Sequence, residues 1–558
     1  MGFILKCTLI HSALTKWHGN HGTRGCTGSI GAAHRRFARF RALPPCGGAY
    51  RGAGNPHLVG ILTGRYAYKI KKPVNLGFLD FSTLEARRHY CEEELRLNRR
   101  LAPSLYDAVV RISGSAEDPV IEGSGPAMEY AVKMREFPQS MLASRLLADG
   151  ALTGVHIDVL AARITAFHEN TGVAACGCPY GLPEAVIAPA RDNFAALGKL
   201  LPDATDQTRI SALRTWTDHE YHARWTRFGA RQTDGYVREC HGDLHLGNIV
   251  MLDGQLTPFD CIEFNPALRW IDVMSEAAFL VMDLMDRGRA DFASRFLNAY
   301  LEAGGGYHGL DMLRFYLTYR AMVRAKVHAL RAAQDGIAAA ERARLLGASR
   351  GYVELAQRCT HGLSSTGPAI ILLHGVSGSG KSVIAQAMAE QIGAIRLRSD
   401  IERKRLSGLT ALARSGAALA SGIYAAESTF ATYTRLLDLA RRVTNAGYAA
   451  VVDATFLKRW QRDLFRRQAD AQNIPFVIVD VTAPEAVLRA RIATRLAAGS
   501  DASEANQAVL TRQLAQSETL TGDESSAVLR FDTSRADVEA TVQDACAALH
   551  ARLAAVII

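Results

Sequence analysis

The pattern of hydrophobic and polar positions divides the chain into two parts with different periodicities. In the first part, apolar and β-branched segments predict strands at 66–72, 109–112 and 127–134, and a helical pattern occupies 82–102. Mostly helical patterns then cover 137–235 and 272–358. A small lobe that contains strands, followed by a large helical lobe, predicts an α+β protein-kinase-like bilobal fold.

The second part has short apolar runs that alternate with helical stretches. These runs lie at 369–373, 394–397, 449–452, 476–481 and 528–531. Continuous apolar strands separated by helices are typical of a parallel sheet that is covered on both faces. We therefore expect an α/β domain with a doubly wound parallel sheet.

These patterns set the expected domain boundaries. The glycine- and serine-rich segment 362–368 is the predicted linker between a first domain at 58–361 and a second at 369–558. Residues 1–57 are rich in Gly, Arg, His and Ala, contain no acid and show no clear period. They favour a disordered or non-native extension over an amphipathic transit peptide.

Composition narrows the class of protein. The net charge of +10 does not describe most of the chain. Residues 1–79 hold twelve basic and no acidic side chains, which leaves 53 basic against 55 acidic ones in 80–558. A nearly neutral body makes a nucleic-acid partner unlikely by charge. Ten cysteines in 558 residues indicate free thiols in the cytoplasm, and no apolar run reaches the ~18 residues of a membrane span.

The clearest motif of the second part is a complete G-x-x-x-x-G-K-[ST] loop. It consists of Gly375, Val376, Ser377, Gly378, Ser379, Gly380, Lys381 and Ser382. Glycines let backbone N–H groups close around phosphate oxygens, Lys381 reaches the β- and γ-phosphates, and the Ser382 hydroxyl binds Mg²⁺. Since a buried strand precedes the loop and a helix follows it, the motif predicts a site for ATP or GTP.

Other residues of the second part are placed to assist phosphoryl transfer. Asp400 follows the second strand and could accept a proton from an acceptor hydroxyl, while Arg403 could hold an anionic substrate; a helix N-cap is the alternative. Asp453 ends an apolar strand, where a carboxylate can order Mg²⁺ or simply cap the strand. Arg491 and Arg495 share one helix face, as lid arginines or as a solvated basic face.

The second part resembles the small P-loop kinases grouped with polynucleotide kinase, gluconate kinase and chloramphenicol phosphotransferase. The features that carry the resemblance are GVSGSGKS, the SD-x-x-R segment, VVDAT at a strand end and the R-x-x-x-R pair. The resemblance implies a P-loop kinase fold that binds a nucleoside triphosphate, and it leaves the acceptor open.

The first part contains a second phosphate-handling motif, His241-Gly-Asp-Leu-His-Leu-Gly-Asn248, followed by Asp260. In a kinase-like fold one Asp orients the acceptor hydroxyl, and an Asn five residues later and a further Asp hold the Mg²⁺ ions on ATP. Asp243, Asn248 and Asp260 occur in that order. They predict a catalytic Asp243 and metal ligands Asn248 and Asp260.

Upstream residues complete this second motif. Tyr66-Ala67-Tyr68-Lys69 is similar to the strand that carries the ATP-binding lysine of kinases, so Lys69 is the candidate and Lys71, on the same strand face, stays an alternative. Glu94 is the candidate ion-pair partner, although Glu92 and Glu93 are adjacent in the same predicted helix. No glycine-rich ATP-covering loop or strand pair precedes Tyr66.

Residues from about 58 to 360 resemble the aminoglycoside phosphotransferase family, whose members carry HGDxxxxN and a later metal-binding Asp. The segments YKIKKPVNLGFLDFSTLEARR, NRRLAP, HGDLHLGNI and FDCIEFNPALRWID resemble one branch in particular, a bacterial fusion with a P-loop kinase domain. The fusion implies two ATP and Mg²⁺ sites that phosphorylate small molecules on a hydroxyl group. A nucleotide-sensing regulator with an inactive kinase-like module, and a polynucleotide 5′-kinase, are the alternatives.

Overall fold

The computed structural model describes residues 58–75, 79–115, 118–363, 366–411, 413, 425–498, 503–534 and 538–557. The expectation of a disordered extension at 1–57 lies outside these residues. The described chain forms two compact units. The kinase-like unit comprises the residues up to Asp286 together with Phe315–Thr360, and the P-loop unit comprises Arg287–Arg314 together with the chain from His361 onward. No helix among the described residues is long and apolar enough to cross a membrane.

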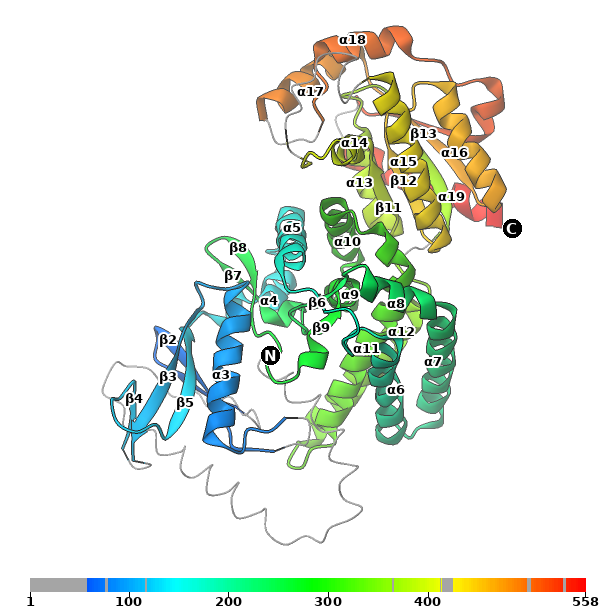
Figure 1. Cartoon of the computed structure of the whole chain (residues 1–558). Helices are drawn as coiled ribbons and strands as arrows, with labels where there is room; N and C mark the ends of the chain where they lie inside the picture. The colour runs from blue at the N-terminus through cyan, green and yellow to red at the C-terminus, as the bar shows by residue number, and fades with distance from the viewer. Residues whose placement is uncertain are drawn as a thin grey trace. The chain divides into compact units, whose positions relative to one another are not determined.

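A five-stranded antiparallel sheet forms the small lobe of the kinase-like unit. Its order is β1-β2-β5-β3-β4, with bounds Leu58–Leu62, Tyr66–Lys71, Glu129–Arg135, Tyr106–Gly114 and Pro119–Ile121. The helix α3 (Leu84–Arg99) packs against β5 and β3 (Figure 1). The hydroxyl of Thr83 caps α3 by accepting a hydrogen bond from the Ala86 N–H. The predicted strands β2, β3 and β5 and this helix are confirmed, whereas β1 was not expected.

The large lobe is mainly helical, as predicted. Its helices are α4 (Ala143–Ala148), α5 (Gly154–Asn170), α6 (Pro183–Leu200), α7 (Ala204–Ala223), α8 (Trp225–Thr233), α9 (Val273–Asp286), most of α11 (Leu310–Ala332) and α12 (Ala339–Cys359). Two small antiparallel ladders join β6 (Val237–Glu239) to β9 (Trp270–Asp272) and β7 (Ile249–Leu252) to β8 (Gln255–Pro258). Nearly every residue of α9 is buried, so this apolar segment is a core helix.

The P-loop unit contains a parallel sheet of order β11-β12-β10-β13-β14. Its strands are β10 (Ala369–His374), β11 (Ile395–Arg398), β12 (Ala449–Asp453), β13 (Phe476–Thr482) and β14 (Val528–Asp532), which confirms the five predicted strands. All of β10 is buried, because helices cover both of its faces. The doubly wound parallel sheet expected from the sequence is therefore present.

Helices form the outer layers of the P-loop unit. Those that follow the sheet strands are α13 (Lys381–Ile392), α14 (Ser399–Leu406), α15 (Ala426–Asn445), α16 (Arg459–Gln472), α17 (Glu485–Ala498), α18 (Gln507–Gln516) and α19 (Val538–Ile557). α13 and α19 share one apolar core with β10, and α15 and α16 pack beside each other and on the sheet (Figure 1). One further helix, α10 (Ala290–Gly304), packs on α13 and β11, although it precedes the expected linker by about sixty residues.

Two candidate phosphoryl-transfer sites

The lysine site of the kinase-like unit is a buried network of opposite charges. Strand β2 presents Lys69, whose Nζ lies 2.6 Å from Glu94 Oε1 on α3 and 2.6 Å from Asp260 Oδ1 after β8. Burial opposes the charge of Lys69, but Asp260 and Glu94 outweigh it and raise its pKa well above the usual value. The structure thus brings together three of the predicted residues.

The alternative lysine is part of the same network. Lys71 Nζ lies 2.8 Å from Glu94 Oε2 and 2.5 Å from Glu263 Oε1, so one carboxylate bridges both lysines. The neighbouring acids of α3 have other partners: Glu92 pairs with Arg88 at 2.8 Å, and Glu93 pairs with Arg96 at 2.9 Å. Among these three glutamates, only Glu94 is placed against the lysines.

The predicted catalytic loop follows β6 and turns back into β7. Asn248 donates from Nδ2 to Asp243 Oδ2 at 2.9 Å, and the oxygen Oδ1 of Asn248 is buried without a hydrogen-bond partner among the described residues. An uncommitted amide oxygen is a suitable ligand for a hard cation such as Mg²⁺. Burial disfavours the charged form of Asp243, but the neighbouring His245, Arg324 and His241 outweigh this effect and lower its pKa.

Asp260 has an unusual backbone conformation. Its φ is 67°, in the left-handed region, and its N–H donates to the Tyr106 hydroxyl at 3.2 Å. The next N–H, that of Cys261, donates to Asn98 Oδ1 at 2.9 Å. Strained residues that are held by their surroundings cluster at functional sites. The hydrogen bonds to Tyr106 and Asn98 hold the backbone in this conformation, from which the Asp260 carboxylate meets Lys69.

A glutamate of α9 holds the backbone of the catalytic loop. Glu276 accepts hydrogen bonds from the His241 N–H at 3.0 Å, the Gly242 N–H at 2.6 Å and His168 Nε2 at 2.9 Å. Burial would raise its pKa, but His168 and His241 lower the pKa of Glu276 to about 2, so the carboxylate is charged at neutral pH. Glu276 therefore fixes the loop immediately before Asp243.

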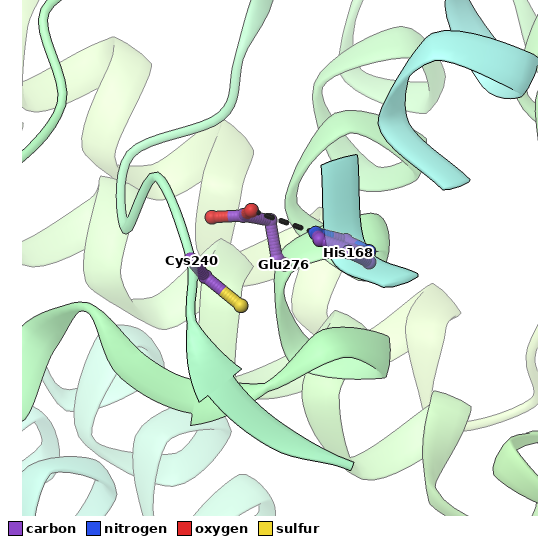
Figure 2. Close-up of side chains that lie close together, drawn as sticks. All are labelled: His168, Cys240 and Glu276. Carbon is purple, nitrogen blue, oxygen red and sulfur yellow. Dashed lines mark hydrogen bonds and ion pairs between the residues drawn. The ribbon is translucent and has the colours of Figure 1, made fainter. Parts of the chain in front are cut away.

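Figure 2 shows that Cys240 joins His168 and Glu276 in one buried group that has the residue types of a metal site. A cysteine binds a metal as the thiolate. Burial raises the pKa of the Cys240 thiol well above its usual value, and its Sγ donates to the Ile271 carbonyl at 3.5 Å. Since both Glu276 oxygens already accept N–H donors, these side chains fit a structural role better than a metal centre.

Two arginines of α11 border the same loop. Arg320 lies 3.5 Å from the Gly242 carbonyl and donates to Ser275 Oγ at 3.1 Å. One turn later, Arg324 donates to the Tyr352 hydroxyl at 3.4 Å, and its Nε and one terminal nitrogen are buried without hydrogen-bond partners among the described residues. A positive charge with uncommitted donors close to Asp243 is suited to an anionic group.

Sequence reasoning missed several residues of this site: Glu263, Glu276, Arg320 and Arg324. Glu263 follows Asp260 by three residues, a spacing that could have drawn attention to it. Glu276 interrupts a strongly apolar helix, and a charge at a buried helical position indicates a specific partner. The two arginines lie four residues apart on α11, so the sequence predicts that they share a helix face, but it does not predict that this face borders the catalytic loop.

The P-loop of the second unit has the geometry of a backbone cradle. Gly375, Gly378 and Gly380 have φ values of 142°, 84° and 97°, which residues with a Cβ rarely adopt. A Cβ on Gly375 would lie 2.4 Å from the Val481 carbonyl oxygen. Lys381 Nζ donates to the Val376 carbonyl at 2.8 Å, and burial lowers its pKa to about 8. The glycine conformations therefore set the shape of the loop, and the Val376 carbonyl holds the Lys381 side chain against it.

The strand ends of this unit bring the predicted carboxylates to the loop. Asp453, at the end of β12, is in register with Leu373 of β10 and Arg398 of β11. Asp400 lies in the first turn of α14, directly after β11, and Arg403 follows one turn later. The charges of Asp453 and Asp400 both act on Lys381, so the three groups share one electrostatic environment. The Ser382 hydroxyl and the Asp453 carboxylate are oxygen ligands that fit Mg²⁺.

The two predicted lid arginines of α17 differ in their contacts. Arg491 donates to the Gly378 carbonyl at 3.3 Å and to the Thr533 carbonyl and hydroxyl at 2.7 and 2.9 Å. Arg495 donates to the Ala505 carbonyl at 2.9 Å, and its charge contributes to the lowered pKa of Lys381. Arg491 thus contacts the phosphate loop directly, while Arg495 acts on its lysine through charge.

Comparison with known proteins finds a family match within the P-loop unit and relatives that align with most of the chain. The family described as an AAA domain matches residues 370–520. The uncharacterized protein Rv2004c of Mycobacterium tuberculosis (strain H37Rv) is 30% identical over 459 residues, which cover 82% of this chain and 89% of that protein. The uncharacterized protein Mb2027c of Mycobacterium bovis matches with the same identity and coverage.

Two solved structures each align with part of this chain. A sugar kinase from Janibacter sp. HTCC2649 covers 34% of this chain and 98% of its own, with 23% identity and a TM-score of 0.27. A choline/ethanolamine kinase family protein from Mesorhizobium loti covers 59% of this chain and 99% of its own, with 12% identity and a TM-score of 0.35.

Kinase-like domains point to ATP-dependent phosphoryl transfer, and the sheet orders and the site geometry described above place one such domain in each half of the chain. The chain belongs to the family of these mycobacterial proteins, and the AAA domain match lies in its P-loop unit.

Proposed function

We propose that the protein is a bifunctional small-molecule kinase with two separate ATP and Mg²⁺ sites. Each site would move the γ-phosphoryl group of ATP to a hydroxyl group of its own acceptor. The observation that supports this proposal is that, in each compact unit, side chains predicted to handle phosphate lie close together. One set is the Lys69, Glu94 and Asp260 network beside Asp243, and the other is the P-loop beside Asp400 and Asp453.

In the kinase-like unit, the buried charges would position the nucleotide and the acceptor. Lys69, held by Glu94, would bind the α- and β-phosphates, and Asn248 and Asp260 would hold Mg²⁺, which neutralises phosphate charge when it is bound. Asp243 would accept a hydrogen bond from the acceptor hydroxyl and orient it for attack. Its lowered pKa keeps the carboxylate ionised at neutral pH, as an acceptor of that proton must be.

In the P-loop unit, backbone N–H groups would bind the phosphates and Lys381 would supply a point charge. Ser382 and Asp453 would hold Mg²⁺, and Arg491 and Arg495 would stabilise charge on the transferring group. Asp400, at the start of α14, would orient the acceptor hydroxyl, with Arg403 binding an anionic part of the acceptor. Catalysis in both units would come mainly from positioning and charge neutralisation.

The test is phosphoryl transfer from γ-labelled ATP into a metabolite extract, with the wild type, Asp243→Asn and Lys381→Met. We expect labelled products that fall into two groups, each lost in one variant only. Free labelled phosphate as the sole product, abolished by Lys381→Met and unchanged in Asp243→Asn, would instead indicate a P-loop ATPase with an inactive kinase-like module.

A further inference from the structure

Arg324 of α11 is a buried cation that leaves most of its hydrogen-bonding capacity unused. One terminal nitrogen donates to the Tyr352 hydroxyl of α12 at 3.4 Å. Its Nε and its other terminal nitrogen are buried without hydrogen-bond partners among the described residues. Because unpaired buried donors cost free energy, an arginine in this state indicates a binding role.

The preceding arginine on the same helix face has its nitrogens engaged. Arg320 donates from Nε to the Ser275 carbonyl at 3.2 Å and from a terminal nitrogen to Ser275 Oγ at 3.1 Å. Its other terminal nitrogen lies 3.5 Å from the Gly242 carbonyl of the catalytic loop. Arg320 is therefore held against the loop by the protein itself, whereas Arg324, one turn later, keeps two nitrogens available.

Arg324 carries its charge in spite of its burial. Burial would lower its pKa, but Tyr352, Asp283 and Asp243 together raise the pKa above the usual value for arginine. In the described chain neither aspartate accepts a hydrogen bond from Arg324. Asp283 of α9 is instead engaged with the catalytic loop, since its Oδ2 accepts the Leu246 N–H at 2.9 Å.

Arg324 belongs to the part of the site where the acceptor hydroxyl is expected. Burial opposes ionisation of Asp243, and the charge of Arg324 is among the influences that nevertheless lower its pKa. At Lys69, by contrast, Asp260 and Glu94 are the main charges that outweigh burial. Arg324 and Asp243 are equally buried, each 6% exposed. The two groups therefore share one enclosed environment.

Aromatic packing sets the position of the guanidinium. The Tyr352 ring stacks on His328 with centroids 5.5 Å apart, and the guanidinium carbon of Arg324 lies 5.4 Å from the Tyr352 centroid. Burial and the nearby Arg324 lower the pKa of His328 to about 3, so this imidazole is neutral at physiological pH. A guanidinium held at one end, with donors available along its edge, matches the two oxygens of a carboxylate or phosphate group.

We propose that Arg324 determines the specificity of the kinase-like unit, and that its acceptor is an alcohol bearing a carboxylate or phosphate group. This anionic group would bind the guanidinium, and the hydroxyl would lie against Asp243. The acceptor oxygen would form a bond to the γ-phosphorus while the bond to the bridging oxygen of ADP breaks, and the hydroxyl proton would pass to Asp243. This assignment rests on the proposed function, because it names the acceptor class of that same site.

The experiment divides a deproteinised metabolite extract by charge. Ion-exchange resins at neutral pH give anionic, neutral and cationic pools, and each is incubated with γ-labelled ATP, Mg²⁺ and the full-length Lys381→Met variant. Product that disappears when Asp243→Asn is added to this variant comes from the kinase-like unit. We expect such product from the anionic pool. Product from the neutral or cationic pool alone would overturn the anionic acceptor and leave the kinase activity intact.

A phosphatase distinguishes the two kinds of anion. The anionic pool is treated with the phosphatase, which is removed before the kinase is added. Loss of acceptor activity would identify a phosphate-bearing alcohol, and retained activity would identify a carboxylate. Either result supports an acceptor that binds through its negative charge.

Variants of Arg324 test whether this side chain recognises the acceptor. Arg324→Gln should raise the amount of anionic pool needed for half-maximal labelling by about tenfold or more, because a bidentate charge-assisted contact is lost. The half-saturating ATP concentration should stay unchanged. Arg324→Lys keeps the charge but not the planar fork, so its requirement should lie between those of the other two proteins.

Arg331→Gln is the matched control, because it removes the same charge from the same helix face two turns later. Arg331 lies 3.9 Å from Glu341, and its substitution should leave the acceptor requirement unchanged. No shift with Arg324→Gln, an equal shift with Arg331→Gln, or a shift in the ATP requirement in place of the acceptor requirement would overturn the assignment. Should Arg324→Gln fail to fold, the charge of the pool that supplies the acceptor still decides.

Absence of Asp243-dependent product from all three pools would contradict the proposed function of the kinase-like unit, and the anionic acceptor with it. That result differs from product formed out of the wrong pool, which contradicts the acceptor class alone.

Discussion

The two units hold their phosphate-binding lysines in opposite environments. Lys69 lies between the carboxylates of Glu94 and Asp260, which raise its pKa. Lys381 has the Val376 carbonyl as its close partner at 2.8 Å, and burial lowers its pKa to about 8. The first lysine is in direct contact with fixed negative charges, whereas the close partner of the second is a neutral carbonyl, although the charges of Asp453 and Asp400 also act on it.

The difference shows two ways to prepare a site for a polyanion. In the kinase-like unit, opposite charges are already paired, so binding of ATP exchanges one set of ionic contacts for another. In the P-loop unit, the glycine loop supplies backbone N–H donors, and the lowered pKa of Lys381 means that its charged form is less favoured than in a free lysine until phosphate is present.

Replacing each lysine by methionine should change stability in opposite directions. Lys69→Met leaves Glu94 and Asp260 buried with an unmatched negative charge and should lower the free energy of unfolding by about 3–5 kcal/mol. Lys381→Met removes a buried ammonium group whose charged form is disfavoured, and should raise that free energy by about 1–3 kcal/mol. Chemical denaturation of the two variants without nucleotide measures both. Equal destabilisation by the two substitutions would contradict the proposed difference between the two lysine environments.

The loop that carries Asp243 depends on one carboxylate. Glu276→Gln would replace one of the two carboxylate oxygens by an amide N–H₂, and would so leave either the His241 N–H or the Gly242 N–H without its acceptor, at a cost of ~2–3 kcal/mol. We expect weaker phosphoryl transfer by the kinase-like unit and a lower melting temperature, with the products of the P-loop unit unchanged. Glu341, which is partly exposed and pairs with Arg344, gives a control variant, Glu341→Gln, that should alter neither.

The assignment of α10 to the P-loop unit can be tested at Asn298. Asn298→Ala leaves the Arg396 N–H and the Ala394 carbonyl without the partner they have in the wild type, and should lower stability by about 2 kcal/mol. Bound nucleotide at the P-loop should recover part of the loss in a thermal melt. Asn170→Ala, at an exposed helix end, should change stability by less than about 0.5 kcal/mol. Similar losses in the two variants would argue against the assignment.

The pH dependence of nucleotide affinity should differ between the sites. Phosphate raises the pKa of Lys381, so the bound state keeps a proton that the free site loses above pH 8. Affinity at the P-loop should therefore fall as pH rises from 7 to 9, by up to about tenfold. Affinity at the other site should stay flat in this range, because the pKa of Lys69 is raised. Nucleotide titrations of the Asp260→Asn and Lys381→Met variants measure the two sites separately. The same pH dependence at both sites would contradict the proposed difference between the two lysines.

The motifs that sequence alone could identify are those whose chemistry requires fixed residue types at fixed spacing. The P-loop needs glycines because its backbone adopts positive φ values. Asp243 and Asn248 must lie a few residues apart because their side chains meet within one short loop. The choice of Glu94 over its two neighbours follows from its helix face, since Cys91 and Leu97 share its buried side. The role of Lys71 emerged only with Glu263, which is distant in sequence.

Long-range packing was beyond the reach of the sequence. The amphipathic pattern of α10 predicts a helix with a buried face, and it contains no information about which surface that face covers. The partners of Glu276 and Arg324 could not be predicted for the same reason, because they come from elements far along the chain. Strand β1 pairs with β2 along its whole length, yet its five residues show too little alternation to predict it.

The most direct test of the central claim is the number of ATP sites. Equilibrium dialysis of the full-length chain against a non-hydrolysable ATP analogue and Mg²⁺ measures the molecules bound per chain. The account predicts two for the wild type and one each for Asp260→Asn and Lys381→Met. A single bound molecule in the wild type, lost in Lys381→Met and kept in Asp260→Asn, would contradict it and leave the kinase-like unit without a nucleotide.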